Sequence, residues 1–227
     1  MRRALSLPVL ASLLLGAVAC TTGEKKGDSS AEDATCNELL GEAGLMWLEG
    51  RTGGPGKVRL KNTDDLKKAR SLFYDQVENW GPDDSGVPTF VDADVCRART
   101  DVENPKKELA LRYGPSVLPF DFPFGVASGV TPAPTVTPVN SAVKLVHGKD
   151  RDGRLSYRVY VKCKIPGMPT KQENEIPIEG ELTDTLTGDT GARVHLTHLL
   201  HSAKVVADSF GCQNKPVVPA EPPTSVK

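Results

Sequence analysis

The first twenty residues constrain this chain more than any other stretch, because they determine the compartment in which the remainder folds. A positively charged start is followed by an apolar run over residues 4–16 and by the small residues Ala17 and Ala19. This order is typical of a secretory signal peptide. The apolar run is shorter than the roughly 20 residues that a membrane-spanning helix needs. We therefore expect residues 1–19 to direct export and to be removed.

Cys20 follows directly after this cleavage site. The junction Ala17-Val18-Ala19-Cys20 resembles the lipobox of bacterial lipoproteins, with Ala17 standing where that family prefers Leu. The resemblance implies a diacylglyceryl group on the Cys20 sulfur, which would anchor the protein to the extracytoplasmic face of the cell membrane. Two acyl chains make such an anchor stable, whereas one alone binds reversibly. The alternative is an ordinary secretory signal whose first mature residue is a cysteine.

The wider chain is similar to small lipoproteins of unknown function from high-GC Gram-positive bacteria. Besides the lipobox, three stretches carry the resemblance: a polar tether, the motif Thr35-Cys36-Asn37-Glu38-Leu39-Leu40 and the closing Phe210-Gly211-Cys212. The resemblance implies a location at the cell envelope and no particular activity.

With Cys20 assigned to the lipid, four cysteines remain: Cys36, Cys96, Cys163 and Cys212. An even number in an oxidising compartment predicts two disulfides, and four cysteines allow three pairings. We favour Cys36–Cys96 and Cys163–Cys212, one in each half of the chain, and the other pairings stay open. A zinc site is disfavoured because no Cys-x2-Cys or Cys-x2-His spacing occurs.

Composition divides the rest of the chain into segments. Residues 20–35 are small, polar and charged, which predicts a disordered tether. Residues 36–113 form an N-terminal half and residues 141–212 a C-terminal half, joined by a segment rich in proline and phenylalanine over residues 114–140. Residues 213–227 contain four prolines and predict a disordered tail.

Three amphipathic helices are predicted from apolar residues at helical spacing. They cover residues 36–49, a stretch from a cap at Thr63 to Trp80, and residues 192–210. A Thr35/Glu38 capping box precedes the first helix. In the last one, seven apolar side chains share one face, and Gly211 follows as a C-cap.

Strands are predicted over residues 57–60, 90–100, 109–113, 142–147, 155–165 and 178–182. Cys163 lies in the apolar phase of the strongest one, so we expect its sulfur on the buried face. Pro177 favours an edge position or a strand start for the last one. Strands grouped between helices at both chain ends favour an α+β fold with an antiparallel sheet, and whether the two halves are similar is left open.

The connecting segment holds one candidate site. Phe120, Phe122 and Phe124 alternate within a proline-stiffened stretch. Such a row of rings is suited to an adhesive patch for a partner or for lipid. The favoured interpretation is that these rings cover the core between the two halves.

Three of the four histidines lie on the last predicted helix. His195 falls at the border of the apolar face, whereas His198 and His201 fall on the polar face, where two histidines at i, i+3 are suited to share a metal. The His-Glu-x-x-His motif is absent. A solvent-exposed helix face is therefore the favoured interpretation, and a weak metal or pH-sensing site is the alternative.

No catalytic motif is found in the sequence. The glycine cluster before Lys57 lacks the spacing of a phosphate-binding loop, and Glu179 and Glu181 are expected on the solvated face of their strand. A net charge of −1 disfavours a nucleic-acid partner, and no cofactor is indicated. We therefore expect a lipid-anchored, non-enzymatic binding or interaction protein. The alternatives are a small-ligand carrier with a cavity between sheet and helices and, less favoured, a hydrolase.

Overall fold

The computed structural model describes residues 31–81, 89–100, 107–124, 132–149 and 153–226. The predicted signal peptide, the predicted lipid-attachment residue Cys20 and most of the predicted tether lie outside these ranges. The last residues of that tether are an exception, because the first described helix already begins at Ala31.

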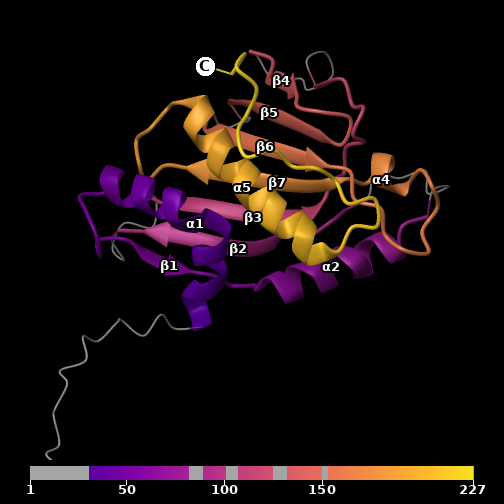
Figure 1. The fold of residues 1–227 in the computed structure, drawn as a ribbon, viewed down its shortest axis with the longest axis horizontal. Helices are drawn as coiled ribbons and strands as arrows, with labels where there is room; N and C mark the ends of the chain where they lie inside the picture. The colour runs from indigo at the N-terminus through magenta and orange to yellow at the C-terminus, as the bar shows by residue number, and fades with distance from the viewer. Residues whose placement is uncertain (1–30, 82–88, 101–106, 125–131, 150–152, 227) are drawn as a thin grey trace, which may run out of the picture.

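The described chain forms one seven-stranded antiparallel sheet with helices packed on it (Figure 1). The helices are α1 (Ala31–Arg51), α2 (Leu66–Glu78), α4 (Gln172–Glu175) and α5 (Ala192–Phe210). The strands are β1 (Arg59–Lys61), β2 (Ala93–Arg99), β3 (Leu109–Pro115), β4 (Thr135–Pro138), β5 (Val143–Lys149), β6 (Leu155–Val161) and β7 (Ile178–Asp184). The predicted α+β class is confirmed.

The strand order is β1-β2-β3-β7-β6-β5-β4. β7, the last strand in the sequence, therefore lies at the centre, between β3 of the N-terminal half and β6 of the C-terminal half. Of the two positions that Pro177 allows, the structure has the strand start and not the edge. The two halves share this one sheet, and the order of their elements differs.

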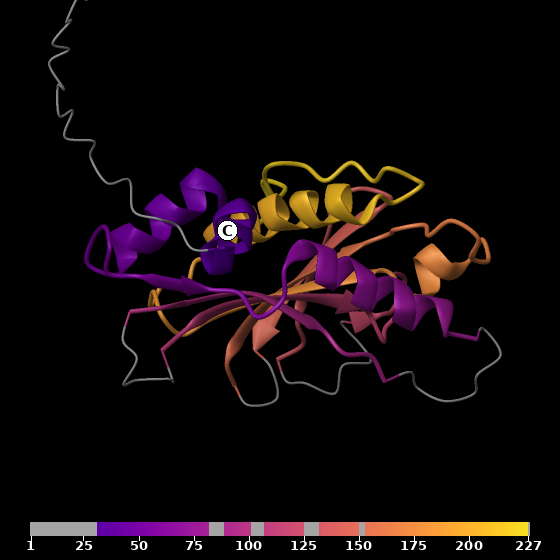
Figure 2. The same cartoon turned by 90° about the horizontal axis from the view of Figure 1, so that it is seen from below.

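Three helices cover one face of the sheet, as Figure 2 shows for α1, α2 and α5. α5 packs on β6 and β7 with the apolar face that its sequence predicts. All seven of the apolar side chains on that face are buried, namely Leu196, Leu199, Leu200, Ala203, Val206, Ala207 and Phe210. Gly211 ends the helix in the left-handed conformation with φ 68°. The bounds and the cap of this helix are confirmed.

α1 is longer than predicted and is broken at Gly41, which has φ 61° and ψ 175°. Glycine adopts this conformation without the steric cost that a Cβ atom brings. The ring of His201 fills the adjacent space, so that a Cβ atom on residue 41 would lie 2.7 Å from His201 Nε2. The break therefore results from packing against α5 and has no signal in helical periodicity.

Both predicted disulfides are present. Cys36–Cys96 joins α1 to β2, and Cys163–Cys212 joins the segment after β6 to the end of α5. The linked cysteines are 60 and 49 residues apart. Closing loops of this size stabilises a fold by about 4 kcal/mol each in the chain-entropy model. Each bridge ties a helix to the sheet layer within its own half.

Residues 213–226 are not the disordered tail that their prolines predict. Val218 and Val226 are buried in the main core. The backbone is also held, since Asn140 Nδ2 donates a hydrogen bond to Val217 O and Arg193 Nη1 donates one to Pro223 O. Proline removes the backbone donor that a helix needs but does not prevent an extended segment from packing. This prediction is wrong for that reason.

The phenylalanine segment covers the sheet face opposite the three helices. Phe120 and Phe124 are buried with Val146 of β5 and Tyr160 of β6 in a second, small hydrophobic cluster, against which Phe122 packs. An adhesive patch of exposed rings is therefore wrong for this segment. The rings do cover a hydrophobic cluster, as the favoured interpretation expects. That cluster lies on the far face of the sheet, however, and not between the two halves.

Candidate functional site

Charged side chains of three central strands meet on the sheet face opposite the helices. The strand register places Arg112 of β3 beside Glu181 of β7, and Glu181 beside Arg158 of β6. Arg158 Nη2 lies 2.9 Å from Glu181 Oε1, and Arg112 Nη1 lies 3.9 Å from Glu181 Oε2. A row of alternating charge therefore crosses the middle of the sheet.

Glu179 lies on the same face, two residues before Glu181. Its Oε1 accepts a hydrogen bond from Tyr160 Oη at 3.1 Å and lies 3.4 Å from Arg158 Nε. Burial raises the pKa of the Glu179 carboxyl above its usual value, and nearby Asp92 adds to this effect, although Arg158 and hydrogen bonds oppose it. An added positive charge is therefore favoured beside Glu179.

The two glutamates are not the freely solvated pair that strand alternation predicts. Only 22% of the Glu179 side chain and 21% of the Glu181 side chain are exposed. The reason is the central position of β7, which places neighbouring strands on both sides of these carboxylates. Alternation identifies their face correctly but does not reveal what covers it.

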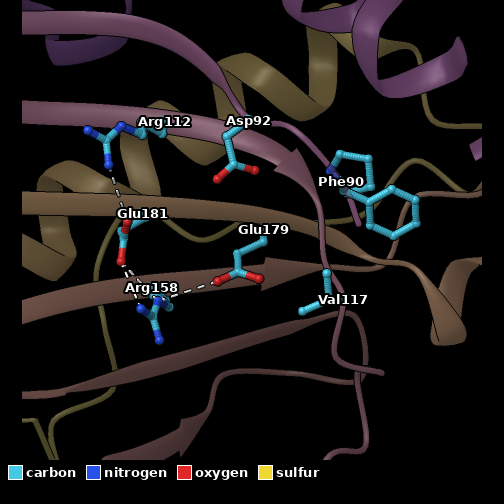
Figure 3. Close-up of a pocket in the computed structure, with 8 residues that line it drawn as sticks. Phe90, Asp92, Arg112, Val117, Arg158, Glu179 and Glu181 are labelled. Atoms are coloured by element: carbon cyan, nitrogen blue, oxygen red, sulfur yellow. Dashed lines mark hydrogen bonds and ion pairs between the residues drawn. The ribbon is translucent and has the colours of Figure 1, made fainter. Parts of the chain in front are cut away.

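Asp92 reaches the same place from the segment that leads into β2, as Figure 3 shows. Its carboxylate lies over Gly114 of β3, where a Cβ atom would collide with it. Among the described residues, none forms an ion pair or hydrogen bond with this carboxylate. Asp92 is exposed as a residue, but partial desolvation of its carboxylate in the cleft and the charge of Glu181 raise its pKa, while the two arginines oppose this shift.

These side chains line a cleft of about 210 Å³. Phe90, Pro115 and Val117 complete its wall, and Val117 is 41% exposed. In Figure 3, Phe90 and Val117 lie on the Glu179 side of the cleft, whereas Arg112 lies at the opposite end. The cleft is therefore charged at one end and partly apolar at the other.

The cleft holds an excess of negative charge. Three carboxylates and two guanidinium groups line it, so one carboxylate is left without a compensating cation when all five groups are ionised. Asp92 is that carboxylate, since both arginines contact the glutamates. Such an arrangement can bind a cation or hold a proton on a carboxyl group.

Sequence reasoning did not single out Asp92, Arg112 or Arg158. The available signal was the presence of both signs of charge in the polar phase of the predicted strands. That signal became specific only through the register, which brings Arg112, Arg158 and Glu181 into one row.

The histidines of α5 lie in a different place from this cleft. His198 is buried and not solvated as predicted, because its ring stacks on Trp47 of α1 with centroids 4.7 Å apart. His201 is exposed, and its Nε2 lies 3.2 Å from Glu38 O. In the described part of the chain, no group of three or more His, Cys, Asp or Glu side chains is placed to hold a metal ion.

His195, expected at the border of the apolar face, is fully buried between the sheet and α1. Its Nε2 lies 2.9 Å from Asp184 Oδ2, and its Nδ1 lies 2.8 Å from Gly191 O. Both partners are acceptors, so both nitrogens donate only when the ring is protonated. The ring also stacks on Tyr157 with centroids 4.3 Å apart. This pair is enclosed by the core.

Fold and site together define an α+β protein with helices on one face of its sheet and a charged cleft on the other. Comparison with models of known families, with curated proteins and with solved structures finds no match. Among the helices that the structure describes, none combines the length and the apolar character needed to cross a membrane.

Proposed function

We propose that this chain is a lipid-anchored binding protein on the outer side of the cell membrane, with the charged cleft as its ligand site. The lipobox resemblance around Cys20 supports the anchor. The two disulfides are compatible with an oxidising, extracytoplasmic compartment.

The cleft is the observation that carries the binding role. Carboxyl groups with raised pKa values that line a cleft mark a candidate functional site. A carrier with an apolar cavity between sheet and helices fits less well. Large side chains from both layers, such as Tyr113, Tyr157 and Phe210, are fully buried in that space.

The anchor is tested by the intact mass of the protein purified from membranes. We expect an N-terminus at Cys20 that carries a diacylglyceryl group, and we expect a Cys20→Ser variant to appear in the culture medium. An unmodified N-terminus that begins before Cys20 would contradict the anchor.

The binding role is tested by a thermal-shift screen of amines, carboxylates, sugars and lipids. A ligand that binds only the folded protein raises Tm. We expect at least one class to raise the Tm of the wild-type protein and to lose this effect in Asp92→Asn. No shift with any class would argue against a small-ligand site.

A further inference from the structure

Resting on the proposed function, we infer that the cleft binds a small organic ammonium ion. The cationic head lies between the carboxylates of Asp92 and Glu179, and the apolar part of the ligand lies against Phe90 and Val117. The ligand class is a primary amine that is protonated at neutral pH and carries a short apolar chain.

Charge selects a cation over an anion. Arg158 lies within 3.4 Å of Glu179 and 2.9 Å of Glu181, so its guanidinium is already engaged by carboxylates. An anion entering the cleft would have to displace one of these contacts and would meet three carboxylates. A cation meets Asp92, which has no ion-pair partner among the described residues, so no ion pair has to break.

Repulsion between the carboxylates also favours a cation in the cleft. Asp92 feels the negative charge of Glu181, and Glu179 feels that of Asp92. A positive head group between Asp92 and Glu179 would relieve both repulsions together. Desolvation is the main cause of the raised pKa values of the two carboxyls, and repulsion from neighbouring carboxylates adds to it, so a positive head group is favoured there.

The apolar wall selects an organic cation over a bare metal ion. Phe90 and Val117 lie at the cleft and leave part of their surface to solvent, with Val117 41% exposed. Both apolar side chains lose exposed surface when they cover the ligand's apolar chain, which is favourable. A hydrated inorganic ion has no apolar chain to place against Phe90 and Val117. A volume of about 210 Å³ accommodates only a short chain.

The test is isothermal titration calorimetry of the full lipidated chain in neutral detergent, at pH 7.5 and low salt. The probes are n-butylammonium, ammonium, n-butyrate and norleucine, of which the last carries a butyl chain on a zwitterion. We expect n-butylammonium to bind at least tenfold more tightly than n-butyrate and more tightly than ammonium. Tighter binding of norleucine or n-butyrate would overturn the assignment to a cation.

The matched variants are Asp92→Asn in the cleft and Asp75→Asn, an exposed carboxylate on α2. We expect Asp92→Asn to weaken n-butylammonium binding at least tenfold, as the loss of a charged contact does, and Asp75→Asn to leave it unchanged. Phe90→Leu should weaken it severalfold. Equal binding by the wild type and Asp92→Asn overturns the inference.

The Tm of the unliganded Asp92→Asn variant shows whether Asp92 contacts the ligand or supports the fold. Because the carboxylate of Asp92 is unpaired among the described residues and lies beside Glu181, Asp92→Asn should keep or raise the Tm of the unliganded protein. Acidification should also weaken binding at a higher pH than an ordinary carboxylate requires. A large fall in Tm would assign Asp92 to the fold, and Phe90→Leu then remains as the test of the site.

The two experiments together separate the ligand class from the binding role. If no butyl probe binds, yet the broad screen finds a ligand whose effect is lost in Asp92→Asn, the cation assignment is wrong and the binding role stands. If neither experiment finds a ligand, both are wrong.

Discussion

His198 of α5 stacks on the partly buried ring of Trp47 of α1, and the burial of His198 makes this contact sensitive to pH. Burial lowers the pKa of His198 to about 4, and the nearby His195 and His201 act in the same direction. The unfolded chain therefore takes up a proton near pH 6.5, before the folded protein does.

We accordingly expect acid to destabilise the protein. Above pH 6.5 the ring is neutral in both states, so it adds no pH dependence. Between about pH 6.5 and 4, its contribution lowers the free energy of unfolding by about 1–3 kcal/mol. Urea denaturation from pH 7.5 to 4.5 measures this. His198→Phe, which keeps a ring on Trp47, should lose part of the slope, and an unchanged slope would exclude His198 as its origin.

Asp184 is the buried counterpart of His195, with 1% of its side chain exposed. Burial acts to raise the pKa of Asp184, but hydrogen bonds from His195, Thr187 and the Leu186 backbone outweigh it and hold the pKa below its usual value. Asp184→Asn removes the buried carboxylate that accepts hydrogen bonds from His195 and Thr187. Weakening these buried hydrogen bonds should cost about 1–3 kcal/mol, which denaturant unfolding at pH 7 would measure.

The control is Asp208→Asn, whose carboxylate pairs with Lys204 at 2.7 Å on the exposed face of α5. Exposed pairs contribute less than about 1 kcal/mol. Similar losses for Asp184→Asn and Asp208→Asn would mean that burial does not govern the first pair.

At the scale of the element, the break in α1 depends on a single glycine. Gly41→Ala places a Cβ atom in a backbone region that only glycine favours and against the ring of His201. We expect it to lower the free energy of unfolding by about 1–3 kcal/mol. Gly50 is the matched control, since a Cβ atom there meets nothing within 4 Å.

Gly50→Ala should keep or raise stability, by up to about 1 kcal/mol, as helix propensity predicts. The two alanine variants of one helix therefore differ in sign, and denaturant midpoints measure the difference. Stabilisation by Gly41→Ala would mean that α1 runs straight through residue 41.

At the scale of the whole molecule, the C-terminal segment closes the core that the sheet and helices leave open. Val218 is 7% exposed and Val217 is 75% exposed, although they are neighbours. Val218→Ala should cost about 1–2 kcal/mol, the value of the apolar area it uncovers, whereas Val217→Ala should stay within about 0.5 kcal/mol. Thermal or urea unfolding of both variants tests this, and equal effects would argue that the segment is detached in solution.

Local pattern was sufficient for much of the fold. The bounds of α5, its buried face and its Gly211 cap were predictable because helical periodicity and left-handed termination are properties of neighbouring residues. The pairing of the cysteines was predictable as one bridge per half. The kink at Gly41 was not, because its cause is a ring 160 residues further along the chain.

The sequence by itself determined the class of fold, the strand phases and the disulfide framework, since these depend on short-range periodicity and on cysteine number. It also carries the signal and lipobox pattern on which the predicted anchor depends. Only the tertiary structure decided that β7 is central, that the C-terminal segment is buried and that Asp92, Arg158 and Glu181 share a cleft. Each of these depends on strand order and register, which bring together groups that are distant in sequence and that no local pattern connects.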